Sequence, residues 1–151
     1  MALGLLFAWS AVFSLPAQAD FAEGLAAYDG GDYAAALRTW RALAEAGHLE
    51  AQVALASLYM NGEGVPPDRA AALHWYARAG QAGHPVAQLN LGDIYNRGLG
   101  VPRDVVAAYV WFSLAAAQGR AWAAAQRDTL AREMTPAQRA EAEDKIAARR
   151  R

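Results

Sequence analysis

Apolar residues recur with helical spacing in the middle of the chain. Between positions 50 and 61 they follow the i, i+3, i+4, i+7, i+8 pattern that lines one face of a helix: Ala51, Ala54, Leu55, Leu58 and Tyr59. From 68 to 81 a second face is formed in the same way by Ala72, Trp75, Tyr76 and Ala79. Glycine and proline separate the two stretches. The pattern therefore predicts an antiparallel pair of helices joined by a turn.

The residues of that turn suit the backbone positions they would occupy. Gly62 stands where the first helix should end with positive φ, which glycine adopts at little cost. Pro66 cannot continue the helix. Asp68 precedes the second helix, where its carboxylate can accept a hydrogen bond from a free backbone N–H. A helix–turn–helix unit that ends near Gly83 is the expected result.

The same unit returns 36 residues later without an insertion. The matching signature residues are Gly62 and Gly98, Gly64 and Gly100, Asp68 and Asp104, and Trp75 and Trp111. One helix pair cannot bury its own apolar face, so the units are expected to stack and cover one another. We therefore predict that the aromatic residues are core; a carbohydrate- or base-stacking platform is the alternative.

Weaker units flank the two repeats. A degenerate unit comes first, in which Gly30-Gly31-Asp32 replaces the longer turn. After Gly119 the helices become polar, and Thr135-Pro136-Ala137-Gln138 predicts a capping box with proline at the first helical position. The predicted organisation is a signal peptide over 1–19, a degenerate unit over 20–49, repeats over 50–85 and 86–121, and capping helices over 122–151.

The first 19 residues differ from the rest. An apolar stretch, 3–15, is followed by Ala17-Gln18-Ala19, the small-x-small triplet of a secretory cleavage site. The stretch is shorter than the roughly 20 residues of a membrane span. We expect cleavage after Ala19 and a periplasmic or secreted product that is not inserted in a membrane. An uncleaved anchor is the alternative.

Composition and charge restrict the class of protein. The 151 residues carry a net charge of −1, which argues against a nucleic-acid-binding domain, since such domains are usually basic. There is no cysteine, so an exported form has no disulfide and must be held together by packing alone.

The two full units resemble the Sel1-like (TPR-related) repeat family. The resemblance rests on the pattern A-Q-x-x-L-x-x-x-Y-x-x-G-x-G-V-P-x-D, which occurs twice in register. The 24–37 segment is similar to the TPR-like opening of such proteins, and 134–138 to their C-terminal cap. The resemblance implies an all-α, right-handed α-solenoid of stacked antiparallel helix hairpins with a C-terminal capping helix pair, which binds proteins or peptides.

Residues that suggest catalysis or metal binding have simpler structural interpretations. His48 and His84 occupy equivalent positions in adjacent units, too far apart to share a metal, so we expect turn residues. The glycine pairs lack the Gly-Lys-Ser/Thr of a phosphate-binding loop. Asp68 and Asp104 are explained as helix caps rather than an acid/base pair. We expect no catalytic residue, no metal and no cofactor.

Candidate partner-binding residues lie on the first helix of each repeat. In helix-pair solenoids this helix lines the concave groove, so its side chains outside the core stripe should face solvent. These residues are Val53, Ser57, Met60, Asn61, Leu89, Asn90, Asp93, Asn96 and Arg97. We predict that they bind a segment of another protein, in a monomeric chain; solvated side chains without a role are the alternative.

Three function classes are compatible with these features. The favoured one is a non-catalytic interaction scaffold or regulator in the bacterial cell envelope. A hydrolase of cell-wall or β-lactam substrates, suggested for cysteine-rich relatives, would need a convergent set of ionisable groups that the sequence does not indicate. The third is a structural subunit of an envelope or exopolysaccharide assembly.

Overall fold

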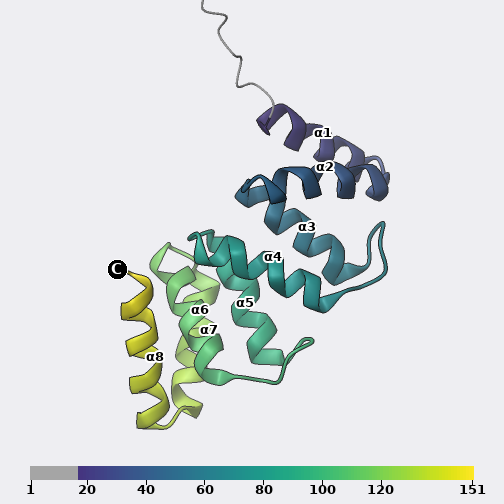
Figure 1. The fold of residues 1–151 in the computed structure, drawn as a ribbon. Coiled ribbons are helices and arrows are strands. Elements are labelled where there is room, and N and C mark those ends of the chain that lie inside the picture. The colour runs from purple at the N-terminus through teal and green to yellow at the C-terminus, as the bar shows by residue number, and fades with distance from the viewer. Residues whose placement is uncertain (1–16) are drawn as a thin grey trace, which may run out of the picture.

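The computed structural model describes residues 17–151, which form helices and contain no strand (Figure 1). The eight helices of this part of the chain are α1 (Ala17–Asp29), α2 (Tyr33–Glu45), α3 (Leu49–Asn61), α4 (Arg69–Gln81), α5 (Pro85–Arg97), α6 (Val105–Ala117), α7 (Ala121–Glu133) and α8 (Pro136–Arg149). The predicted all-α class is confirmed. The predicted signal peptide lies, up to residue 16, outside the described residues.

The helices stack in chain order. From α1 to α7, each helix packs mainly on the one before it and the one after it, so that the stack runs from α1 at one end to α8 at the other (Figure 1). Odd-numbered helices are the first helices of their pairs and even-numbered ones the second. A neighbour thus covers the apolar face that a single pair leaves open.

The helix caps predicted at Asp68 and Asp104 are confirmed, and Asp32 forms a further cap of the same kind. Asp32, Asp68 and Asp104 begin α2, α4 and α6, and each carboxylate accepts a hydrogen bond from the backbone N–H three residues later, at 2.9–3.0 Å. At the start of α8, Thr135 and Gln138 form the predicted capping box. The second helix of every pair therefore begins at a residue that the sequence marks.

The turn position predicted for the two histidines is also confirmed, with a role that their sequence positions did not indicate. His48 and His84 are the N-caps of α3 and α5. Their Nδ1 atoms accept hydrogen bonds from the backbone N–H groups of Ala51 at 3.2 Å and Ala87 at 3.4 Å. An Nδ1 that accepts a hydrogen bond must be unprotonated, so both caps need a neutral imidazole.

His84 makes the stability of the stack depend on pH. Burial lowers the pKa of His84 below its ordinary value, while Glu50 counteracts this shift and Arg120 adds to it. The unfolded chain then takes up the proton more readily than the folded one. The stabilisation is complete above the ordinary pKa of about 6.5 and is lost as the pH falls through the lower pKa of the folded state.

We expect His84→Asn, which keeps a capping oxygen, to flatten the pH dependence of the free energy of unfolding. Urea denaturation between about pH 7.5 and pH 5 measures this, since stability is lost as the pH falls below the ordinary pKa of about 6.5. His74→Asn, on the exposed side of α4, controls for the loss of one histidine. If the free energy of unfolding depended equally on pH in the His84→Asn protein and in the unchanged chain, His84 would not be the source of the pH dependence.

In the first three pairs, the second helix packs an aromatic ring against a small residue of the first helix. In the first and third pairs the small residue is a glycine, and a Cβ atom added to it would overlap with the aromatic ring that faces it. In the second pair the small residue is an alanine, which lies in the same core cluster as a tyrosine. The three pairs are Gly24 with Trp40, Ala56 with Tyr76, and Gly92 with Phe112. The rings repeat at 36-residue intervals, so the same contact recurs in these three hairpins.

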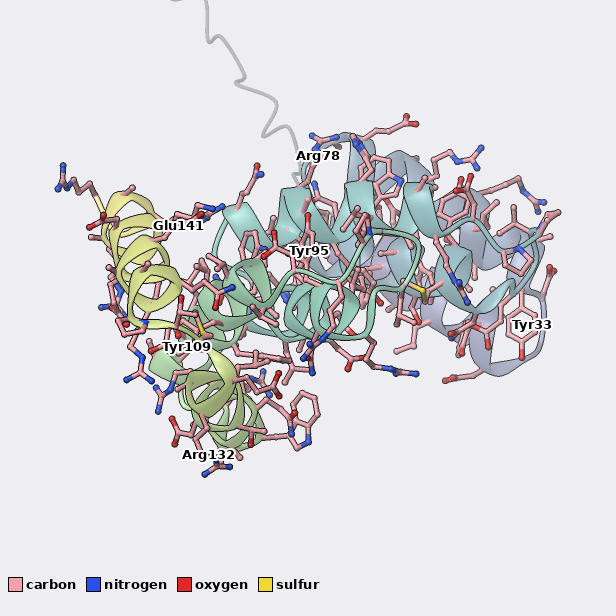
Figure 2. All side chains as sticks on the ribbon, turned by 90° about the horizontal axis from the view of Figure 1, so that it is seen from below. Tyr33, Arg78, Tyr95, Tyr109, Arg132 and Glu141 are labelled. Atoms are coloured by element: carbon pink, nitrogen blue, oxygen red, sulfur yellow. The ribbon has the colours of Figure 1, made fainter. Side chains whose placement is uncertain are left out.

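The two repeat tryptophans are buried to different degrees. Trp111 is buried as predicted, at 5% exposure. Trp75 is only half-buried; it packs between two core clusters, and the Arg78 guanidinium lies 5.1 Å from its ring centre. Arg78 itself points out of α4 (Figure 2). The core role of Trp75 is therefore shared with a cation–π contact at the surface.

The Gly-x-Gly turns connect one pair to the previous pair. Gly62 and Gly98 end α3 and α5 with φ of 73° and 67°, as predicted. Gly64 has a φ of 72°, and its backbone approaches Tyr33, the first residue of α2, so closely that a Cβ would lie 2.7 Å from the Tyr33 carbonyl carbon. Gly100 likewise approaches Arg69, the first residue of α4, but here the contact is with the Arg69 side chain. The second glycine of each turn is thus an inter-pair contact.

The last two helices break this pattern. α8 makes its main contacts with α6 rather than with α7 (Figure 1). The cause lies on α7, where Arg127 and Asp128 occupy the positions that Leu91 and Gly92 hold on α5. Arg127 and Asp128 form an ion pair at 2.8 Å, and covering this pair with a helix would require its desolvation. α8 therefore packs on α6, where Ile146 joins the core.

Candidate functional site

The nine predicted partner-binding residues lie on α3 and α5, and all of them are at least partly exposed. Asn61 and Arg97, at the ends of the two helices, are the most open. The other seven are half-buried: Val53, Ser57, Met60, Leu89, Asn90, Asp93 and Asn96. The structure therefore places the set at the surface, and its role in binding stays a prediction.

The apolar members of the set also serve the core. Val53 and Met60 pack against the cluster around Tyr76, and Leu89 packs against the cluster around Phe112. Each closes the edge of a core cluster while part of its surface remains open. These residues are less solvent-facing than the spacing on α3 and α5 predicts.

The polar members already have partners within the chain. Asn90 donates to the Val86 carbonyl at 2.9 Å, and the Arg97 guanidinium pairs with Asp93 at 3.1 Å. The Asn96 carbonyl accepts a hydrogen bond from the Arg103 side chain at 2.9 Å. On α3, the Ser57 hydroxyl forms a hydrogen bond with Tyr76. Burial raises the pKa of Tyr76 to about 12, and the hydrogen bond with Ser57 acts in the opposite direction. A partner must exchange these contacts rather than meet free groups.

Trp122, on α7, is a surface residue that the sequence pattern did not single out. Its side chain is 49% exposed, and its ring meets Phe112 edge to face at 5.6 Å between centroids. It stands 36 residues after Val86, so extending the repeat offset by one more unit would have placed it beside the predicted set. We define the first-helix face as the surface formed by Val53, Ser57, Leu89, Asn90, Asp93, Arg97 and Trp122.

Within residues 17–151, no group of three or more histidine or acidic side chains is placed to hold a metal ion. Over the same residues, no helix combines the length and the apolar character needed to cross a bilayer. What the face offers chemically is hydrogen bonding, charge and apolar contact.

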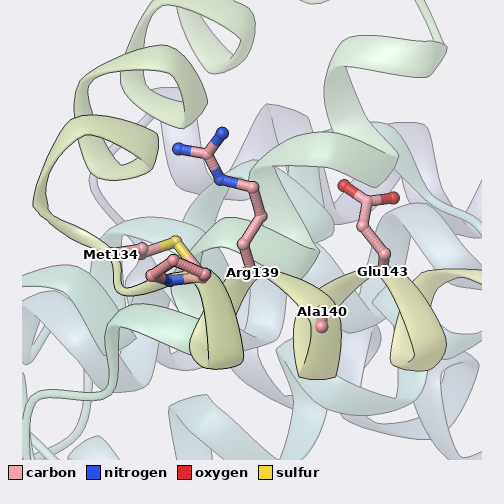
Figure 3. Close-up of a pocket in the computed structure, with 5 residues that line it drawn as sticks. Met134, Arg139, Ala140 and Glu143 are labelled. Carbon is pink, nitrogen blue, oxygen red and sulfur yellow. The ribbon is translucent and has the colours of Figure 1, made fainter.

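Cavities gather at the C-terminal end of the stack. One, of about 430 Å³, lies at the α7–α8 turn between Met134, Arg139 and Glu143 (Figure 3). A second, of about 220 Å³, lies between α6, α7 and α8 and shares Glu143 with the first. A third, of about 410 Å³, lies between α4, α6 and α8, where the Arg149 guanidinium sits 4.9 Å from the Trp111 ring centre.

Comparison with known proteins agrees with this architecture. The Sel1 repeat family model matches residues 49–84 and 85–119. The chain is similar to a Sel1 repeat protein from Oxalobacter formigenes, with 37% identity and a TM-score of 0.68, over 75% of this chain and 88% of that one.

A longer solved structure is similar as well. It is a protective antigen of uropathogenic Escherichia coli strains that displays an SLR fold, with 29% identity and a TM-score of 0.83 over 89% of this chain. This chain spans only 30% of that protein's length. Among curated protein sequences, none matches the chain.

Proposed function

The chain belongs to the Sel1 repeat family, and on that premise we propose that it is a non-catalytic interaction scaffold that binds a segment of a partner protein on the first-helix face. The fold supports this proposal because stacked pairs present their first helices side by side as one extended surface. An elongated segment of a partner could contact α3, α5 and α7 together.

The exposed ring of Trp122 is the observation that carries the proposal. Large aromatic side chains supply much of the binding energy at protein interfaces, because they bury a large area with few rotatable bonds. Trp122 rests against Phe112, which is fully buried, so the ring is supported from below. Leu89 on α5 and Val53 on α3 add two partly exposed apolar side chains to the face.

The polar residues of the face supply orientation. Asp93 and Arg97 form an exposed ion pair at 3.1 Å, which contributes little to stability and is readily exchanged. Opening it presents a carboxylate and a guanidinium one helical turn apart, which can pair with the backbone or the charges of a bound segment.

We expect Trp122→Ala to weaken partner binding about 30-fold, the loss of about 2 kcal/mol typical of an interface hot spot. Partners are first captured from an envelope fraction with the full chain, and the affinity of each identified partner is then measured with both forms. Combined replacement of Asn90, Asp93 and Arg97 by alanine tests the polar half of the face.

Arg38→Ala, at an exposed position of α2, is the matched control. It should leave every captured partner bound. Unchanged affinity in both the Trp122 variant and the triple variant, with circular dichroism showing intact helices, would rule out this face as the binding site.

We further infer that the protein acts outside the cytoplasm, in the periplasm or beyond. The support is the apolar stretch of residues 3–15 and the Ala17-Gln18-Ala19 triplet that follows it. The intact mass of the protein recovered from the envelope fraction of its host tests this, with a chain that begins at Asp20 as the expected product. Recovery of a chain that retains its first 19 residues would contradict cleavage.

A further inference from the structure

The divergence of α7 and α8 leaves a cavity with a polar lining at the end of the stack. Its volume is about 220 Å³, and α6 forms one side. The lining residues are Tyr109, Ser113, Ala116, Ala117, Arg127, Glu143, Ile146 and Arg150. Figure 2 labels Tyr109, from α6, close to the α7 and α8 ribbons. Charged side chains from α7 and α8 thus face a helix that is otherwise apolar.

Ser113 is the first sign that the cavity has a ligand. The residue is 7% exposed, and its Oγ atom is buried without a hydrogen-bond partner. A serine within a helix can bond back to the carbonyl of the preceding turn, but here it does not. Leaving a buried hydroxyl unpaired is costly, so native proteins rarely keep one without a reason.

The charges around Ser113 indicate what kind of group would fit the cavity. Arg127 reaches the cavity from α7 and Arg150 from the residue after α8. Within residues 17–151, no acid lies within ion-pair distance of Arg150. The single acid of the lining, Glu143, already accepts a hydrogen bond from the Tyr109 hydroxyl at 3.0 Å. The lining therefore has an excess of donors and of positive charge.

The state of Tyr109 reinforces this arrangement. Burial and the neighbouring Glu143 raise the pKa of Tyr109, although Arg127 and Arg139 act in the opposite direction. The hydroxyl stays protonated and keeps donating to Glu143. That acid is thus held by the tyrosine, so it does not neutralise the two arginines: Arg150 has no ion-pair partner within the described residues, and Arg127 pairs only with the exposed Asp128.

We propose that this cavity binds a carboxylate group, which accepts hydrogen bonds from the guanidinium groups of Arg127 and Arg150 and from the hydroxyl of Ser113. A carboxylate has two oxygens that accept several donors and pairs well with arginine. Ala116, Ala117 and Ile146 give the aliphatic part of the ligand an apolar wall. Asp128, which now pairs with Arg127, is mostly exposed and can return to water.

The cavity volume of about 220 Å³ admits only a small molecule or the end of a chain as the carrier of the carboxylate. It is either a free short-chain dicarboxylate or the C-terminal carboxylate of another polypeptide. This site does not depend on the first-helix face, so either proposal can fail while the other stands.

Nuclear magnetic resonance titration of the full chain with three probes tests the site. The probes are glutarate, the peptide N-acetyl-Ala-Ala-Leu with a free carboxyl group, and the same peptide as its C-terminal amide. A saturable shift of the Ser113 amide and of the arginine Nε–H signals is expected with the acids and not with the amide. Tighter binding of the peptide acid identifies a chain terminus as the ligand, and tighter binding of glutarate a small acid.

Variants separate a ligand site from a merely structural role. Ser113→Ala should leave the stability of the free protein unchanged or raise it, because an unpaired hydroxyl is removed, while it weakens carboxylate binding about tenfold. Arg127→Gln and Arg150→Gln should each weaken it by at least as much. Arg132→Gln, on the exposed part of α7, is the matched control. No saturable shift with either acid, or equal affinity in the Ser113→Ala protein, would overturn the proposal.

Discussion

Replacing Phe112 by alanine is expected to lower the free energy of unfolding by about 3–5 kcal/mol, the usual cost of removing a fully buried aromatic side chain. The ring is 0% exposed. It lies against Gly92 of α5 and meets Trp122 of α7 edge to face, so three consecutive helices lose a shared contact. The glycine opposite has no side chain with which to fill the space.

Urea denaturation followed by circular dichroism measures this loss, and hydrogen exchange locates it. Leu114→Ala is the matched control, because Leu114 is half-buried on the same helix and should cost clearly less. The protection of backbone amides against exchange should fall first in α7 and α8, because both helices pack on α6. A cost for Phe112→Ala no larger than that for Leu114→Ala would show that the ring does not hold the three helices together.

Gly64→Ala is the second large effect that we expect, with a loss of about 2–5 kcal/mol. A side chain at a φ of 72° costs about 1–2 kcal/mol, and forcing a methyl group against a packed neighbour adds about 1–3 kcal/mol. The neighbour is the backbone of Tyr33 at the start of α2, which cannot rotate away as a flexible side chain can.

Gly83→Ala isolates the second of these terms. Gly83 also has a positive φ, of 93°, but a Cβ there would meet nothing within 4 Å. Only the backbone strain of about 1–2 kcal/mol should appear. The difference between the two alanine variants, measured by the same denaturation, gives the energy of the contact between neighbouring pairs. Equal losses of stability in the two variants would mean that the contact between the turn after α3 and the start of α2 contributes nothing to stability.

Local features of the fold were predictable because their causes lie within a few residues. Asp68 and Asp104 cap the next helix, and Gly62 and Gly98 end the one before, through backbone geometry that depends on sequence spacing alone. The repeat offset then extends the prediction from one full unit to the next.

Contacts between helices were harder to foresee. The pairing of Gly92 with Phe112 depends on which residues meet across a hairpin, and helical spacing does not give that. The docking of α8 on α6 follows from Arg127 and Asp128, which the same offset would have aligned with Leu91 and Gly92. In both cases the sequence contains the residues responsible, but their role can be recognised only when equivalent core positions of the units are compared.

The partial exposure of the candidate residues was predictable, but their contacts within the chain were not. Helical phase correctly placed Asn90 and Asp93 at the surface of α5. It could not show that Asn90 bonds to its own helix, or that Arg103 reaches back to Asn96 from the following turn. Such contacts depend on side-chain rotamers and on the path of the turn.

The Arg127–Asp128 pair on α7 also determines where additional repeat units can be inserted into the stack. A duplicated 36-residue unit placed between Gly83 and His84 would meet a matching hairpin on each side, with every cap and aromatic contact repeated. A unit added behind α8 would face Arg127 and Asp128 instead of leucine and glycine, and Ala148 where Phe112 stands one unit earlier. Lengthening by gene duplication is therefore accommodated inside the array and resisted at its C-terminal boundary.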